Sequence, residues 1–182
     1  MNGSERSRGT TASVVEFLLT VIAAIAALVY LSMTAYTKDG LWFWPVFNAQ
    51  PSSLVIYCYG NQVSLDGTSA DAQELARLLN DQLSGDKRWD ELTLTNDTYN
   101  DYVSDPAFLV LEYIYPEGQR VHSPSPFFTG FTSLILPVDA RHADSNTVFS
   151  LINGKPAGGS YHVESILPIK NYIDQSNLCV KP

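Results

Sequence analysis

The feature that most constrains this chain is a long apolar run near its N-terminus. From Phe17 to Met33 there is no charged residue, and adding residues 14–16 gives the roughly 20 residues that a helix needs to cross about 30 Å of hydrocarbon. The run also lacks the polar face of a helix packed against a soluble core. We therefore predict a transmembrane helix over residues 13–36, with Glu16 close enough to its end to reach the headgroups.

The residues after the run bear on whether the helix is cleaved. A signal peptide has an apolar region of about 7–15 residues followed by an A-x-A-like site. This run is longer, and "YLSMTAYTKDG" matches such a site poorly. Trp42, Phe43 and Trp44 come next, and aromatic side chains favour the membrane–water interface. We predict a retained anchor with these three residues at the interface, the alternative for them being a hydrophobic cluster of the domain.

The charges around the helix predict its orientation. Arg6 and Arg8 precede the helix, whereas Lys38 and Asp39 cancel after it. By the positive-inside rule, residues 1–12 form a cytoplasmic tail and the part after the helix lies outside. The sequence thus predicts a single-pass cell-membrane protein with an extracytoplasmic C-terminal domain.

The composition after the helix is that of one acidic globular domain. The chain has 182 residues and a net charge of −8, and the part after residue 37 holds seventeen Asp and Glu against nine Lys and Arg. Phosphate recognition needs clustered basic side chains, which this part lacks. The composition therefore argues against a nucleic-acid partner and leaves the bilayer and other proteins of a membrane complex or envelope as expected partners.

The N-terminal segment has a loose family resemblance. "SRGTTASVVEFLLTVIAAIAALVYL" is similar to the signal-anchor of pilin-like and tight-adherence pseudopilin proteins, in which a small-residue stretch precedes a Glu and an apolar helix. Gly9 and Glu16 supply those features, but their spacing is two residues longer than in that pattern. In pilins the helix also runs on into the head domain, whereas here "KDG" and Pro45 are expected to break it. The overall layout also resembles uncharacterised bacterial proteins with one membrane anchor and a small extracytoplasmic domain.

The rest of the chain predicts an α+β domain, 53–182, joined to the membrane helix by an aromatic juxtamembrane tether, 37–52. "SLVIYCYG" from Ser53 is typical of a strand, and "QVSLDG" predicts its hairpin partner. An amphipathic helix of about fourteen residues should follow, with Thr68 and Asp71 as its capping box and Gly85 at its end.

Further strands and short helices complete the predicted domain. We expect a short helix between Asn96 and Ser104, and strands in "AFLVLEYIYPEG", "FTSLILPVDARH", "NTVFSLING" and "KPAGGSYHVES". Pro168 suits the first turn of a final helix. Strands gathered after a helix with hairpin-length links favour a mainly antiparallel sheet.

Two cysteines lie at opposite ends of this domain. In an oxidising compartment, a bridge between Cys58 and Cys179 would staple the C-terminal tail to the first strand. Buried free thiols are the alternative, because cysteine is a common core residue. We predict the bridge.

No pattern of catalytic residues stands out. His162 and Glu164 would share one face of a strand, which with His142 makes a weak zinc candidate, but no HxH or HExxH spacing accompanies them. We therefore predict no metal, no cofactor and no catalytic activity. An extracytoplasmic enzyme, with or without zinc, is the first alternative, and a pilin-like structural subunit is the second.

Three phenylalanines in a Pro- and Gly-rich loop offer a contact site. Phe127, Phe128 and Phe131 either cap the core or contact a partner or the bilayer. The resulting hypothesis is a non-catalytic anchored protein whose outer domain mediates protein–protein interaction, as an accessory subunit of a membrane complex or an envelope sensor.

Overall fold

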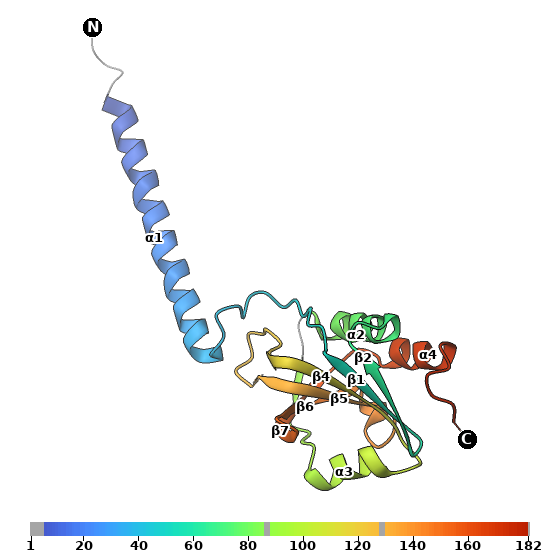
Figure 1. Cartoon of the computed structure of the whole chain (residues 1–182). Coiled ribbons are helices and arrows are strands. Elements are labelled where there is room, and N and C mark those ends of the chain that lie inside the picture. The colour runs from blue at the N-terminus through green and yellow to red at the C-terminus, as the bar shows by residue number, and fades with distance from the viewer. Residues whose placement is uncertain (1–5, 86–87, 128–129, 182) are drawn as a thin grey trace.

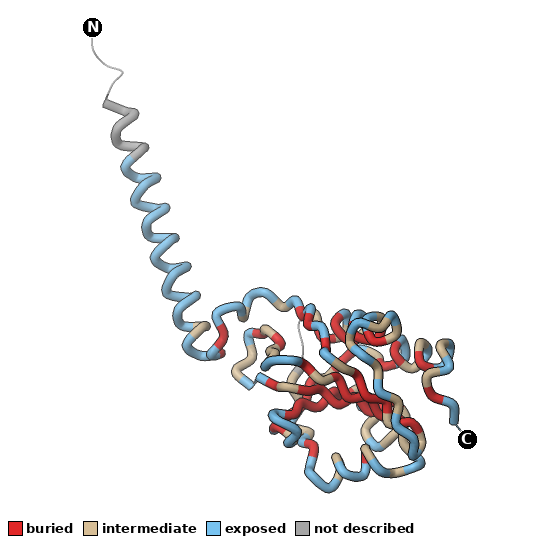
Figure 2. Tube along the Cα trace, in the orientation of Figure 1, coloured by how far each residue is buried: buried red, intermediate tan, exposed pale blue. Residues whose placement is uncertain are grey.

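The computed structural model describes residues 6–85, 88–127 and 130–181. A long helix, α1 (Arg6–Thr37), projects from a folded domain (Figure 1). Its apolar segment, Ser13–Thr37, has 25 residues, and 0% of its most apolar window is buried inside the structure. In Figure 2 the apolar part of this helix is exposed, whereas the strands of the domain are largely buried. By length and composition α1 is long and apolar enough to cross a membrane. A helix is confirmed over the predicted residues 13–36; it begins earlier, at Arg6, and ends one residue later, at Thr37.

The domain is built on one antiparallel sheet. Within the described residues its strands are β1 (Ser53–Cys58), β2 (Asn61–Asp66), β3 (Arg88–Asp90), β4 (Leu109–Gln119), β5 (Phe131–Asp139), β6 (Thr147–Ile152) and β7 (Lys155–His162). Their order in the sheet is β2-β1-β4-β5-β6-β7-β3. The helical elements are α2 (Ala70–Leu83), α3 (Asn96–Ser104), the 3-10 turn η1 (Ala143–Ser145) and α4 (Leu167–Gln175). The predicted α+β class with a mainly antiparallel sheet is confirmed.

Helices cover both faces of the sheet. Because side chains alternate along a strand, Leu111 and Tyr113 of β4 face α2 and α4, whereas Val110 faces α3. The larger core lies under α2 and α4, and a smaller one lies under α3, where Tyr102 packs with Phe149. Figure 1 shows the resulting three layers, with α2 and α4 on one side and α3 on the other.

The β1–β2 hairpin and α2 form as the sequence predicts, except for the cap. Tyr59 and Gly60 both have positive φ, as a two-residue type I′ turn requires. The N-cap of α2 is Ser69, whose hydroxyl accepts the backbone N–H of Ala72. Thr68 instead donates its hydroxyl to Asp66, so the predicted Thr68–Asp71 capping box is wrong. The Thr68 hydroxyl is held in the preceding turn and is not available to cap the helix.

The second half of the predicted tether packs on the domain. Phe47 and Ala49 belong to the larger core. The Phe47 N–H donates to the Ser84 hydroxyl at 3.1 Å, and the Asn80 side chain donates to the Ala49 carbonyl at 3.0 Å. The chain therefore joins the domain at the C-terminal end of α2, before the first strand begins.

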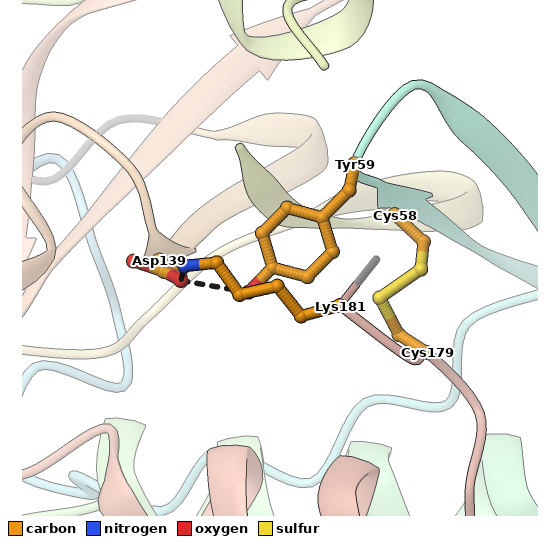
Figure 3. Close-up of a disulfide and its surroundings, with 5 residues drawn as sticks. All are labelled: Cys58, Tyr59, Asp139, Cys179 and Lys181. Carbon is orange, nitrogen blue, oxygen red and sulfur yellow. Dashed lines mark hydrogen bonds and ion pairs between the residues drawn. A yellow bond between two sulfur atoms is a disulfide. The ribbon is translucent and has the colours of Figure 1, made fainter. Parts of the chain in front are cut away.

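The C-terminal tail is fastened to the far end of β1. Cys58 and Cys179 form a disulfide with a Cα–Cα distance of 5.6 Å, which confirms the predicted bridge (Figure 3). Beside it, Lys181 Nζ lies 2.8 Å from a carboxylate oxygen of Asp139, and the Tyr59 hydroxyl donates to the same oxygen at 2.7 Å. These two hydrogen bonds hold the pKa of the Asp139 carboxyl below its usual value.

The sequence patterns missed the short strand β3. Its three residues pair antiparallel with β7, with Arg88 opposite His162 and Asp90 opposite Ser160. Trp89 lies against Gly159, whose φ is +80° and where a Cβ would overlap the indole ring. Gly159 thus lies within β7 at a position where the close approach of Trp89 requires a residue without a side chain.

Candidate functional site

The junction between α1 and the domain is a polar site near the surface that several side-chain hydrogen bonds hold together. Lys38 follows the last residue of α1 with φ 56°, the left-handed conformation that ends a helix. Thr37 is fully buried, and its hydroxyl donates to the Met33 carbonyl at 2.8 Å. The chain therefore stops being helical at the predicted "KDG".

Arg120 clamps this helix end from the segment after β4. Its guanidinium donates to the Thr37 carbonyl at 2.9 Å and to the Lys38 carbonyl at 2.8 Å. The last carbonyls of a helix lack intrahelical donors and carry partial negative charge, so a cation is favoured there. Arg120 thus caps α1 from more than 80 residues away in the sequence.

Asp39 completes what we call the junction clamp: Thr37, Lys38, Asp39, Arg120 and His122. The Asp39 carboxylate is 6% exposed, lies 2.9 Å from His122 Nδ1 and accepts the Leu41 N–H at 2.9 Å. Burial raises the pKa of Asp39, but the hydrogen bonds from His122 and Leu41 and the nearby charge of Arg120 outweigh it, so the net pKa is lowered. Asp39 therefore stays ionised at neutral pH.

The aromatic segment after the clamp folds back along α1. The Phe43 ring lies 6.2 Å from the Tyr30 ring, and the Tyr30 hydroxyl donates to the Gly40 carbonyl at 3.3 Å. Tyr30 is seven residues before the helix end, so Phe43 returns about 10 Å along α1. Phe43 and Trp44 are more than half exposed and Trp42 is half-buried.

Exposure extends this apolar segment beyond the three predicted residues. Leu41 and Val46 are each about half exposed, so we define the collar as Leu41, Trp42, Phe43, Trp44 and Val46. A segment of 25 helical residues is about 37 Å long, which exceeds about 30 Å of hydrocarbon. The surplus is about 7 Å, somewhat less than the roughly 10 Å by which Phe43 returns along α1.

The loop phenylalanines divide between core and surface. Phe131 is 1% exposed and packs with Phe47 and Tyr115, which agrees with the core-capping alternative for this residue. Phe127 is 55% exposed and stacks on Trp89 with 4.7 Å between ring centroids. Phe128 lies outside the described residues.

The weak metal candidates have separate surroundings. His142 Nδ1 lies 2.7 Å from the Tyr102 hydroxyl, and burial together with the charge of Arg141 lowers the pKa of this imidazole. His162 Nδ1 lies 3.6 Å from Asp90, and Glu164 is exposed beyond the end of β7. Among the described residues, no group of three or more His, Cys, Asp or Glu side chains is placed to hold a metal ion.

A buried carboxylate lies between the sheet and α3. Glu112 is 6% exposed and accepts hydrogen bonds from the Tyr57 hydroxyl at 3.0 Å, the Ser133 hydroxyl at 3.1 Å and the Tyr99 hydroxyl at 3.4 Å. Burial, and then the charge of Glu112, raise the pKa of both tyrosines, which stay protonated donors. This network ties α3 to the sheet and offers no activated nucleophile.

Comparisons with protein-family models, with curated proteins and with solved structures each find no match to this chain.

No local sequence signal pointed to the clamp. Asp39 and Arg120 are far apart in the sequence, and "KDG" predicts only the end of the helix, not a partner for Asp39. Only the return of the chain after β4 to the end of α1 brings them together.

Proposed function

We propose that this protein is a non-catalytic, single-pass membrane protein whose extracytoplasmic domain binds other proteins, as an accessory subunit of a membrane complex or an envelope sensor. α1 is a retained signal-anchor with its N-terminus in the cytoplasm. The collar lies at the outer membrane–water interface, and the domain stands immediately beyond it.

The junction clamp is the observation that carries this proposal. Cleavage within "YLSMTAY" would remove Met33, whose carbonyl accepts the Thr37 hydroxyl, so that Arg120 would no longer cap the end of a helix. Because the clamp fixes the end of α1 to the domain, it favours a helix that stays attached. The disulfide supports an oxidising compartment for the domain, outside the cytoplasm.

Glycosylation mapping tests both retention and orientation. The chain carries two N-x-S/T acceptor sequences, Asn2-Gly3-Ser4 before α1 and Asn96-Asp97-Thr98 in the domain, where Asn96 is exposed. Translated with microsomes, the chain should be modified at Asn96 and remain in the membrane pellet after an alkaline carbonate wash. The matched N96Q variant should lose the modification.

Two results would contradict the proposed topology. Modification at Asn2 would mean that the orientation is reversed. Release of a modified domain without α1 would mean that the anchor is cleaved, and a mature N-terminus between Gly9 and Glu16 would instead demand the pilin-like interpretation.

Native purification tests the interaction role. The full-length chain, extracted in mild detergent, should migrate above the mass of a monomer with other chains of the complex. Metal analysis of the same sample separates the proposal from the enzyme alternative, because stoichiometric zinc would favour the latter.

A further inference from the structure

The outer edge of β2 is an open hydrogen-bonding edge of the sheet. β2 pairs with β1 along all six of its residues without a register shift, and no other described strand pairs with it. The opposite edge strand, β3, has only three residues. Proteins usually protect a long edge strand with a bulge, a proline or a lysine. "NQVSLD" has none of these devices.

The register shows which backbone groups of β2 point outward. The Gly67 N–H donates to the Ser52 carbonyl, so residues 52 and 67 form a hydrogen-bonded pair. Such pairs alternate along an antiparallel ladder, so Val63 and Leu65 bond to β1. The backbone groups of Gln62 and Ser64, and the N–H of Asp66, therefore face away from β1.

We propose that this edge pairs with the β2 edge of a second copy of the same chain, in antiparallel register with Ser64 opposite Ser64 of that copy. This deepens the proposed interaction role, on which it rests, by naming the partner. In this register the hydrogen-bonded pairs are Ser64 with Ser64, and Gln62 with Asp66. Both backbone groups of Ser64, the Asp66 N–H and the Gln62 carbonyl then have partners, whereas the Asp66 carbonyl already accepts the Ser69 N–H within its own chain.

The side chains of β2 complement themselves in this register. Val63 and Leu65 lie half-buried on the α2–α4 face, and each would meet the other across the edge as an apolar pair. On the opposite face the Gln62 amide can donate to the Asp66 carboxylate. No two like charges face each other, so the edge suits a second copy of itself.

Cysteine cross-linking of the full-length chain tests this register. The native cysteines are bridged to each other, so a new cysteine is the only reactive thiol. Ser64→Cys should place two thiols across a hydrogen-bonded pair with a Cα–Cα separation of about 5.5 Å, within disulfide range. Oxidation in membranes should then give a covalent dimer of the 20.1 kDa chain.

Gln62→Cys is the matched control, because its two thiols would be four residues out of register, about 13 Å apart along the strand. We expect the S64C dimer to exceed the Q62C dimer at least several-fold. Ser64→Lys places like charges at the axis and should convert the native dimer to monomers on sizing in detergent, without breaking the β1–β2 pairing.

Three outcomes would overturn the proposal: no S64C dimer from a chain whose native bridge is intact, equal cross-linking of Q62C, or capture of a different protein at position 64. Sizing in detergent needs no bilayer. A missing dimer would therefore contradict the β2 pairing and leave the proposed membrane topology standing, because the glycosylation experiment tests that topology separately.

Discussion

Removing the guanidinium of Arg120 should free the end of α1 from the domain. In Arg120→Ala, the Thr37 and Lys38 carbonyls lose their donors, and Asp39 loses the guanidinium 3.9 Å away. His122 still contacts Asp39. We therefore expect local opening of residues 37–41 in a domain that remains folded.

The contacts set the size of the effect. Hydrogen bonds that involve a charged group contribute about 1.5–3 kcal/mol each when buried. The Arg120 side chain is 27% exposed, and water can reach the freed carbonyls. The loss of the two hydrogen bonds therefore costs less than the sum of their full contributions. We expect opening to become easier by about 2 kcal/mol, which corresponds to roughly a 30-fold rise in the open population.

Cleavage at Lys38 reports this opening. The endoproteinase that cuts after lysine has the same sites in the wild-type and variant chains, because the substitution removes an arginine. Cleavage of a transiently open segment follows its population when closing is fast. In detergent, R120A should release a soluble fragment that begins at Asp39 about 30-fold faster than the wild type.

A second arginine provides the control. Arg141 is mostly exposed, and its nearest carboxylate, Asp101, lies 3.8 Å away. Arg141→Ala should therefore leave the release rate unchanged. If R120A released the fragment no faster than R141A, the clamp would not hold the junction, and the reasoning from its hydrogen bonds would be refuted.

Three further predictions concern the domain. The disulfide joins residues 121 apart in the sequence, so the loop-entropy relation predicts that its reduction lowers the free energy of unfolding by about 5 kcal/mol. Urea unfolding with and without reductant measures this difference. The stability of the control variant C58A/C179A should not change when reductant is added. Gly159→Ala should displace Trp89 and lower the free energy of unfolding by about 2 kcal/mol. In a W42F/W44F background, the fluorescence emission of Trp89 should then shift to the red. Gly158→Ala is the control, because its new Cβ would lie in open space and should cause neither change. Every tyrosine after residue 37 has a raised pKa, mainly through burial and, for Tyr172, first through its bond to Asp71, so the folded chain keeps protons that the unfolded chain releases near pH 10. Stability should therefore be full below pH 10 and fall as pH rises above it, and unfolding at pH 11 should increase tyrosinate absorbance; an unchanged absorbance would contradict the burial argument.

The sequence by itself determined the elements whose signals are local. An uninterrupted apolar run predicts α1, apolar residues at helical spacing predict α2, and alternating apolar residues predict most strands, because each pattern records which side of an element leaves water. The pairing of Cys58 with Cys179 also followed from the sequence, since only two cysteines are present. Even the break after Thr37 was readable in "KDG".

Only the tertiary structure decided the features that depend on distant residues. Nothing near Arg120 indicates that it caps a helix that ended 80 residues earlier, and nothing near Trp89 indicates a strand, since β3 exists by pairing with β7. Phe127 and Phe131 share one loop sequence, yet the first is exposed and the second is core. The physical reason is the same in each case: a local pattern reports which residues leave water, whereas the partner that covers or binds a given side chain is set by how the chain returns through space.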